Sequence, residues 1–258
     1  MNKVGKIKDW NKLVRKLYNT GEYFVKRPLI SKDQTDYWID GKSDPDGKTR
    51  NIILEKDRYI SENQYIINYI NNNMHSGKLL DIGCGPGYLL SKISDDFQKF
   101  GCDTSKKAVE SANQYGDVRY ATVENCGFEK NEFDIVVALH VIEHTDDPLG
   151  FIKEIKRIMK KNATLIIAAP DFDSGCARRF GNLYRMLHDP THIRLFSNDS
   201  MHRFLRDHDF SILNVEYPFF ETERFFNKEN MLKMLDKNLS VSPPFYGNFM
   251  TFFCINSS

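Results

Sequence analysis

The spacing of hydrophobic positions changes along the chain and divides it into two parts. In the first part, Trp10, Leu13 and Leu17 recur at intervals of three and four residues, which predicts an amphipathic helix. Isoleucines between residues 60 and 70 predict a second helix that runs towards Asn72. We therefore expect residues 1–76 to form a helical N-terminal lead-in or cap.

In the second part, short apolar runs alternate with longer amphipathic segments. One predicted helix has Pro148 at its first position and continues through Met159, and Ser197 caps another. This alternation predicts an α/β domain with a parallel sheet over residues 77–258. The predicted strands are 78–82, 99–103, 118–121, 133–140, 163–169, 210–217 and 247–255.

Two segments do not fit the alternation, at about 170–196 and about 218–246. In open parallel sheets, ligands bind beyond the carboxyl ends of the strands, so insertions at those ends can form a pocket. We expect these two insertions, together with residues 1–76, to determine which substrate is bound.

The composition narrows the possible partners and compartment. A net charge of +1 with 28% charged residues gives no reason to expect nucleic acid or an anionic membrane as a partner. The five cysteines are odd in number and include no C-x-x-C pair, which favours reduced thiols and a cytoplasmic location. No apolar run approaches the ~18 residues that a transmembrane helix needs, so we expect no membrane insertion. The oligomeric state stays open.

The run from Leu79 to Tyr88 is the most specific motif, because it predicts a buried strand, a glycine-rich turn and the start of a helix. Glycine accepts positive φ and lets a ligand approach bare backbone. A dinucleotide fold needs G-x-G-x-x-G, and its last glycine position is Tyr88 here. Asp81 lies two residues before the first glycine, where a carboxylate repels pyrophosphate and suits a cation.

The string D-I-G-C-G-P-G, with the sequence Gly-Cys-Asp-Thr-Ser at 101–105 and the run 133–144, resembles the class I S-adenosylmethionine-dependent methyltransferases. The resemblance covers about residues 79–169 and is closest to the small-molecule branch of quinone and sugar methylases. It implies a Rossmann-like sheet of seven strands, mostly parallel with the last one antiparallel, flanked by helices. It also implies S-adenosylmethionine as cofactor and S-adenosylhomocysteine as product.

The resemblance assigns roles to individual residues of the cofactor site. Asp81 would face the methionine end of the cofactor, His140 would lie beside the sulfonium, and Asp103 would accept the ribose hydroxyls. Asp103 also ends the second strand about 20 residues after the turn, where a ribose carboxylate is expected. The family's usual acid near adenine is missing at Thr122, which leaves backbone contacts from Thr122 and Val123. The predicted cofactor-binding residues are Asp81, Gly83, Cys84, Gly85, Gly87, Tyr88, Asp103, Thr104, Thr122, Val123 and His140.

Three histidines are candidates for a general base, because imidazole exchanges protons near neutral pH. They are His144, His188 and His192, of which the last two belong to an H-D-P-T-H-I-R stretch that resembles one in the small-molecule branch. A structural, hydrogen-bonded role is the alternative for His192. Glu143 and His144 alone are a poor ligand set, so no metal is predicted.

Arginines and aromatic residues crowd the first insertion and suggest how an acceptor is bound. Tyr184, Arg185 and Arg194 are the predicted substrate-binding residues, since guanidinium groups recognise phosphate. They favour an anionic or sugar-like acceptor, such as a nucleotide-linked sugar. The alternative is a solvated helix face whose arginines are balanced by nearby aspartates.

These observations predict an O-methyltransferase acting on a small molecule, in carbohydrate biosynthesis. An N-methyltransferase acting on an amino sugar or amine stays open, as does a non-catalytic S-adenosylmethionine-binding or scaffold protein. An NAD-linked oxidoreductase is disfavoured by Tyr88 and Asp81. A nucleic-acid or protein-amide methylase is disfavoured because residues 138–141 are Ala-Leu-His-Val rather than Asn/Asp-Pro-Pro-Tyr.

Overall fold

The computed structural model describes residues 10–27, 55–217, 232, 235–236, 238–242 and 249–257. Most of the predicted insertion 218–246 therefore lies outside the described residues. The principal helices are α1 (Trp10–Thr20), α2 (Lys56–Glu62), α3 (Gln64–Asn73), α4 (Lys106–Ala112), α5 (Pro148–Ile158), α6 (Gly175–Phe180) and α7 (Asn198–Asp207).

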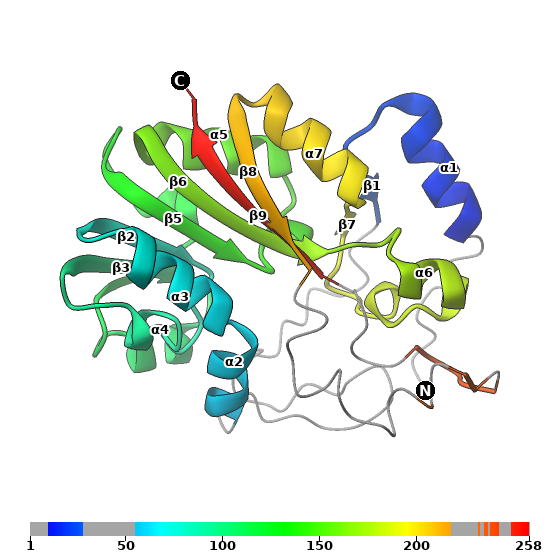
Figure 1. Ribbon diagram of the computed structural model, residues 1–258, viewed down its shortest axis with the longest axis horizontal. Helices are drawn as coiled ribbons and strands as arrows, with labels where there is room; N and C mark the ends of the chain where they lie inside the picture. The colour runs from blue at the N-terminus through cyan, green and yellow to red at the C-terminus, as the bar shows by residue number, and fades with distance from the viewer. Residues whose placement is uncertain are drawn as a thin grey trace.

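A seven-stranded sheet forms the centre of the molecule, with strand order β4-β3-β2-β5-β6-β9-β8 (Figure 1). Neighbouring strands are parallel along the part β4-β3-β2-β5-β6 of this order, and β9 runs antiparallel to both of its neighbours, β6 and β8. The mostly parallel Rossmann-like sheet with an antiparallel last strand is thereby confirmed. The strands are β2 (Gly77–Ile82), β3 (Phe97–Asp103), β4 (Asp117–Tyr120), β5 (Phe133–Leu139), β6 (Met159–Pro170), β8 (Phe210–Glu216) and β9 (Phe249–Asn256).

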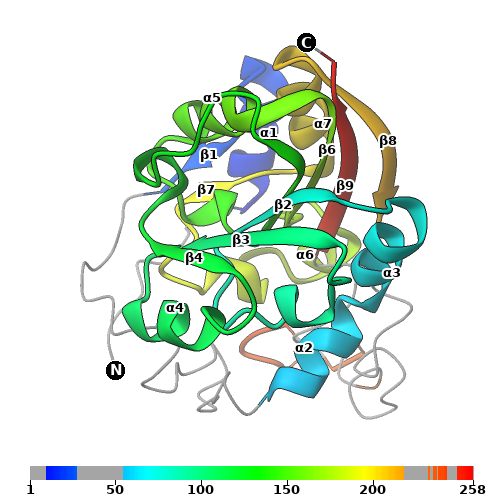
Figure 2. The same ribbon diagram turned by 90° about the vertical axis from the view of Figure 1, so that its left-hand side faces the viewer.

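Helices cover both faces of this sheet, which is why its strands read as nearly continuous apolar runs (Figures 1 and 2). Helices α5 and α7 pack on the face that receives Leu80 and Ile82 of β2. Helices α3 and α4 pack on the other face, which receives Leu79. Successive strand residues point to opposite faces, so Asp81 lies on the same side of the sheet as Leu79.

A smaller third core joins α1 to the first insertion. Trp10 and Leu17 of α1 pack with Phe172 and Tyr184, and the Trp10 indole donates a hydrogen bond to the Phe172 carbonyl at 2.9 Å. Strands β1 (Val25–Lys26) and β7 (Arg194–Leu195) pair antiparallel beside this core. The α1 segment therefore packs on the insertion, whereas α3 packs on the sheet. The division into a lead-in and a domain stays a prediction.

Two local expectations are wrong. The glycine turn does not lead into an α-helix; the segment that follows contains a 3-10 helix at Leu90–Lys92, because Ser94 and Asp96 form the next turn almost at once. The helix that begins at Pro148 ends at Ile158, and Met159 already has extended backbone angles and opens β6.

Candidate active site

The carboxyl ends of β2, β3 and β5 lie side by side and hold the glycine turn. The amide groups of Gly83 and Cys84 both donate to the Cys102 carbonyl, at 2.8 and 3.1 Å. Gly83 and Gly87 have φ of +68° and +79°. A Cβ added at Gly83 would lie 2.5 Å from Val141 Cγ2, and one at Gly87 would lie 2.9 Å from the Tyr115 ring. The turn thus requires glycine both for its conformation and for its close packing.

Asp103 holds this turn to the end of β3. Its Oδ2 accepts a hydrogen bond from the Gly85 amide at 2.9 Å, and its Oδ1 accepts one from the Ser105 amide at 2.8 Å. The N-cap of α4 is Ser105, whose hydroxyl accepts from the Ala108 amide. Asp103 is therefore not needed as a helix cap, and its carboxylate lies where the glycine turn meets the second strand.

Asp81 is a buried acid beside the same turn. Its side chain is 2% exposed, and its Oδ2 has no hydrogen-bond partner among the described residues. Burial raises the pKa of Asp81 well above its usual value, and the charge of Asp103 adds to this effect. A positively charged ligand at this position would relieve the cost of the buried carboxylate. The site therefore fits the cationic end of S-adenosylmethionine.

The remaining predicted cofactor residues surround the turn in different ways. Cys84 is buried, and its thiol lies 3.6 Å from the Gly85 carbonyl oxygen. Tyr88 is also buried and lies with its ring 5.8 Å from that of Tyr59 on α2. Sequence reasoning missed Tyr59, since nothing in the motif indicates which residue of the preceding helix covers the turn. Thr104 is exposed at the end of β3.

The predicted adenine-side residues lie beyond β4. Thr122 is exposed, and its hydroxyl accepts a hydrogen bond from the Asn125 side-chain amide at 3.0 Å. The Val123 side chain is 1% exposed and belongs to the core, so this residue could contact a ligand only through its backbone.

The loop after β5 brings two histidines to a buried glutamate. His140 has φ of +57°, and its Nδ1 lies 3.4 Å from Glu143 Oε1. His144 Nε2 lies 4.0 Å from the same oxygen, while its Nδ1 donates to the Thr191 carbonyl at 3.0 Å. Burial raises the pKa of Glu143, but the close approach of His140 and the neighbouring imidazoles outweigh it, so the net pKa is lowered. Glu143 is therefore an ionised carboxylate held among histidines.

His192, from the first insertion, lies beside Glu143 and His144. This contact could not be expected from the adjacent pair Glu143 and His144 alone. The ring centroid of His192 lies 4.9 Å from that of His144, and its Nδ1 donates to the Met186 carbonyl at 2.9 Å. Burial lowers the pKa of His192 to about 4 despite the nearby Asp189 carboxylate. His188 is not part of the group, because its Nε2 bonds to the Asn182 carbonyl at 2.9 Å.

The predicted acceptor-binding residues are engaged within the insertion. Tyr184 is fully buried and donates to the Asp171 carbonyl at 2.9 Å. Arg185 is 3% exposed, and its guanidinium donates to the Ser242 carbonyl at 3.2 Å. Arg194 donates to the carbonyls of Ile193 and Asp146. These contacts anchor the insertion, and substrate binding by the three residues stays a prediction.

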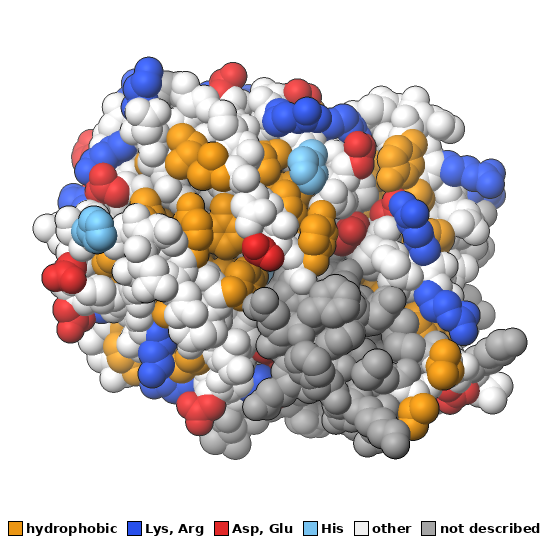
Figure 3. Space-filling view, viewed as in Figure 1, with side chains coloured by type: hydrophobic (Ala, Val, Ile, Leu, Met, Phe, Trp, Pro, Cys, Tyr) orange, Lys and Arg blue, Asp and Glu red, His pale blue; other side chains and the backbone are white. Residues whose placement is uncertain are grey.

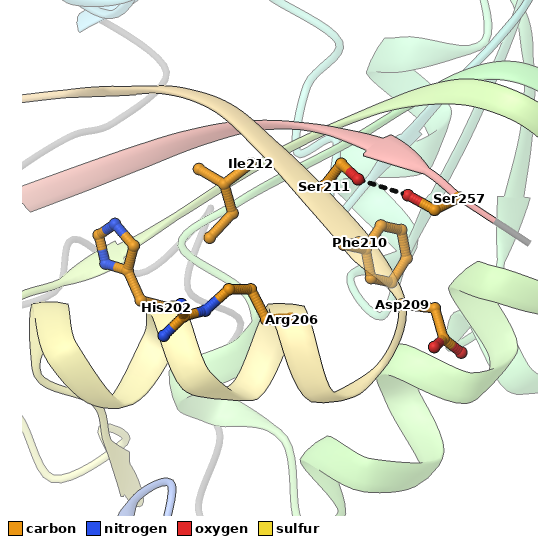
Figure 4. A pocket seen from close by; sticks show the side chains of 7 residues that line it. All are labelled: His202, Arg206, Asp209, Phe210, Ser211, Ile212 and Ser257. Atoms are coloured by element: carbon orange, nitrogen blue, oxygen red, sulfur yellow. Dashed lines mark hydrogen bonds between the residues drawn. The ribbon is translucent and has the colours of Figure 1, made fainter.

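A separate open groove of about 810 Å³ lies between α7 and the beginning of β8 (Figure 4). Strand β8 runs in the same direction as β2, because both β6 and β8 are antiparallel to β9. The first residues of β8 therefore lie at the sheet edge opposite to the glycine turn. The groove residues are His202, Arg206, Asp209, Phe210, Ser211, Ile212 and Ser257.

Comparison with known proteins agrees with this geometry. A family model described as "Methyltransferase domain" matches residues 56–215, which is more than half of the chain. The chain belongs to the class I S-adenosylmethionine-dependent methyltransferases. The match begins with α2, so the helix that carries Tyr59 is part of the methyltransferase unit.

A curated relative shares sequence with this methyltransferase over about half of the chain. The chain is 32% identical over 153 residues to the ubiquinone biosynthesis O-methyltransferase of Pelagibacter ubique, covering 54% of this chain and 61% of that protein. The match thus spans less than two thirds of the relative's length.

Solved structures show the same fold at low sequence identity. A methyltransferase of Haloferax volcanii, in complex with the activator Trm112, has a TM-score of 0.60 at 16% identity, covering 80% of this chain and 93% of that chain. A geranyl diphosphate methyltransferase in complex with GPP and sinefungin has a TM-score of 0.58 at 14% identity, covering 75% of this chain and 76% of that chain. Within the described ranges, none of the helices combines the length and apolar character that a bilayer-spanning segment requires.

Proposed function

We propose that this methyltransferase transfers a methyl group from S-adenosylmethionine to a hydroxyl oxygen of a small-molecule acceptor. The observation that carries the proposal is the buried Asp81 carboxylate, which lacks a hydrogen-bond partner among the described residues beside a turn that only glycine can form. S-adenosylmethionine supplies a methyl group on positively charged sulfur, which needs little further activation. The protein therefore has to bind both reactants and orient the hydroxyl.

Individual residues then have separate tasks in binding the cofactor. Asp81 holds the cationic methionine end by charge, and Asp103 holds the ribose. The hydrogen bond from the Gly85 amide to Asp103 connects the two parts of the site, because it fixes the Asp103 carboxylate against the glycine turn. Tyr59 and Tyr88 close the side of the site that faces α2.

Methyl transfer to a neutral hydroxyl releases one proton, and we assign its acceptance to His140. The imidazole is 39% exposed and lies at the carboxyl end of β5, the sheet edge that holds the glycine turn. Glu143 can accept a hydrogen bond from its Nδ1, which leaves Nε2 available as the base. His140 suits this task better than His192, whose lowered pKa makes it a weak base, or His188, whose Nε2 is bound to a carbonyl.

The acceptor that we propose is a phenolic or related hydroxyl compound. The name of the relative from Pelagibacter ubique, an O-methyltransferase of ubiquinone biosynthesis, favours this class over a sugar. The expected anionic sugar loses its main support, because Arg178 pairs with Asp173 and Arg185 and Arg194 bind main-chain carbonyls.

We expect a small molecule rather than nucleic acid as partner, in a cytoplasmic setting. Basic and acidic side chains are interspersed over the described part of the face in Figure 3, so this face offers no continuous basic surface to nucleic acid. All five cysteines are buried free thiols, which suits a reducing compartment.

The test is formation of S-adenosylhomocysteine by purified protein supplied with S-adenosylmethionine and a panel of catechols, hydroquinones, sugars and amines. We expect product only with hydroxyl acceptors, each gaining one methyl group by mass spectrometry. Methylated amines alone would replace the proposal with N-methyl transfer. Tight S-adenosylmethionine binding without any product across the panel would favour a binding protein.

A further inference from the structure

Phe249, the first residue of β9, packs against the imidazole of His140. The two ring centroids lie 4.6 Å apart and the ring planes meet at 67°, which is an edge-to-face arrangement. Aromatic rings prefer this geometry because the positive edge of one ring meets the negative face of the other. The two residues lie far apart in the sequence, so no local motif accounts for the contact.

The order of the strands brings these two rings together. His140 follows β5 and Phe249 opens β9, and β6 lies between these two strands in the sheet (Figure 1). The His140 amide donates to the Ala168 carbonyl of β6 at 3.0 Å, and Phe249 is paired with Pro170, the last residue of β6. The rings therefore meet across the end of β6, at the sheet edge that holds the glycine turn.

The contact with Phe249 supplies a restraint that the other contacts of His140 lack. Nδ1 of His140 lies 3.4 Å from Oε1 of the buried Glu143, which holds one nitrogen of the ring. The last side-chain torsion of histidine has broad minima, so a contact at one nitrogen leaves the plane of the ring poorly fixed. Phe249 packs against the ring itself and limits its rotation.

We propose that Phe249 is a positioning residue for His140 in methyl transfer, an inference that rests on the proposed role of His140 as the base. In this reaction, the acceptor oxygen forms a bond to the methyl carbon while the carbon–sulfur bond breaks and its electron pair returns to sulfur. The hydroxyl proton passes to Nε2 of His140, which has to lie about 2.6–3.2 Å from the acceptor oxygen. Phe249 keeps Nε2 in that direction and exchanges no proton itself.

Phe253 provides a matched comparison on the same strand. Residues four apart in a strand point to the same face of the sheet, so Phe249 and Phe253 share one face. The ring of Phe253 lies 4.5 Å from that of Tyr69 on α3, at 53°. Phe253 is 2% exposed, whereas Phe249 is half-buried. Phe253 thus makes a similar aromatic contact, but with a helix of the core.

The experiment compares Phe249→Leu with Phe253→Leu in the full-length protein, supplied with S-adenosylmethionine and the panel of hydroxyl acceptors. Phe249→Leu should lower kcat about 3- to 10-fold, the change that one aromatic pair can account for, and leave the dissociation constant of S-adenosylmethionine within about twofold of the wild type. Phe249→Tyr keeps the ring and should restore kcat. Phe253→Leu should lose more stability in urea unfolding and keep its kcat. Phe249→Met repeats the test if Phe249→Leu does not fold.

A double-mutant cycle with His140→Asn separates positioning from general packing. If Phe249 acts through the imidazole, Phe249→Leu should have little further effect on kcat once that ring is gone. An equal loss in both backgrounds would overturn the proposal. The same holds if Phe249→Leu and Phe253→Leu have the same kcat.

The placement of the ring can also be measured without turnover. The ring-proton resonances of His140 are those missing from the spectrum of His140→Asn, and the ring current of Phe249 shifts them. Phe249→Leu should move these resonances, and Phe253→Leu should leave them in place. Unmoved resonances in Phe249→Leu would overturn the proposal. Resonances that move only in Phe249→Leu, with no methylated product from any acceptor, would overturn the proposed function and leave the placement of the ring by Phe249 standing.

Discussion

At the scale of single residues, the proposed chemistry depends on carboxylates that the fold buries. Asp81 is kept in the sheet without a hydrogen-bond donor at its Oδ2 among the described residues, and burial raises its pKa. Such a group destabilises the unliganded protein and strengthens the binding of a cation. A substitution at this position should therefore change stability and binding in opposite directions.

Asp81→Asn should bind S-adenosylmethionine about 10- to 100-fold more weakly, because one charged hydrogen bond contributes about 1.5–3 kcal/mol. The unliganded variant should be at least as stable as the wild type, since a buried charge has been removed. Calorimetry and urea unfolding measure the two effects. Asp117→Asn, at the opposite end of the sheet with a 57% exposed side chain, is the control. Equal affinity in both variants would remove Asp81 from the site.

His140→Asn tests the proposed base without disturbing its backbone. His140 has φ of +57°, and asparagine tolerates this left-handed conformation better than most residues. We expect kcat to fall about 10²- to 10⁴-fold, the usual contribution of a general base, with the dissociation constant of S-adenosylmethionine nearly unchanged. His75→Asn serves as the exposed control. A variant that keeps the wild-type kcat would show that the proton goes elsewhere.

The glycine turn could be predicted from the sequence because its residues are contiguous and its glycines meet a distinct backbone requirement, whereas cofactor binding by these residues stays a prediction. The cluster of Glu143, His144 and His192 could not be predicted, since it depends on how the insertion folds back onto the loop after β5. The burial of Tyr184 and Arg185 could not be predicted either, because α1 packs in the same core as Tyr184, and Ser242, from a distant part of the chain, is hydrogen-bonded to Arg185.

At the scale of elements, the glycine turn combines a strained backbone with close packing, and these two effects can be separated. Gly83 and Gly127 both have φ of +68°, but an added Cβ meets Val141 at Gly83 and no atom within 4 Å at Gly127. Gly127→Ala should therefore cost only the left-handed strain of about 1–2 kcal/mol.

Gly83→Ala should cost more than this strain and should also weaken S-adenosylmethionine binding at least 10-fold, because Val141 and the turn must move apart. Urea unfolding and calorimetry on the two variants give the comparison. If both alanines had the same effects on stability and binding, the close contact with Val141 would be irrelevant.

A second junction, from β6 to α6, predicts a pH dependence. Burial raises the pKa of Asp171 to about 6, against hydrogen bonds from the Asp173 and Asn198 amides that lower it. The folded protein thus holds this proton more tightly than the unfolded chain does. The stabilisation is complete below about pH 4 and is lost as pH rises to about 6.

Asp171→Asn should therefore gain stability relative to the wild type by up to about 3 kcal/mol between pH 4 and pH 7, the equivalent of about two pKa units. Urea unfolding across this range measures the difference, with Asp117→Asn as control. Parallel stability curves for the wild type and Asp171→Asn would contradict the prediction.

Strands were predicted well because helices cover both faces of the sheet, which leaves continuous apolar runs such as 79–80 and 135–138. Boundaries were predicted less well. Met159 continues the apolar pattern of α5 and yet begins β6, since an apolar residue suits either element and only tertiary packing decides.

At the scale of the whole molecule, cofactor binding should stabilise the folded central sheet against unfolding. The proposed cofactor site draws on α2, β2, β3 and the loop after β5. Tyr59 of α2 packs in one hydrophobic core with Leu79 of β2, and the Gly85 amide donates a hydrogen bond to Asp103 of β3. A ligand that binds only this folded arrangement stabilises it by mass action, by about 2.7 kcal/mol at 100 times its dissociation constant. For a chain of this size, that corresponds to a rise in Tm of roughly 5–10 °C.

S-adenosylmethionine and S-adenosylhomocysteine should both produce this rise, whereas NAD should produce none, because Asp81 opposes a pyrophosphate. The Asp81→Asn variant should lose most of the rise with S-adenosylmethionine while keeping its own unliganded Tm. A rise in Tm with NAD and none with S-adenosylmethionine would contradict the assignment of this sheet edge to a cationic cofactor.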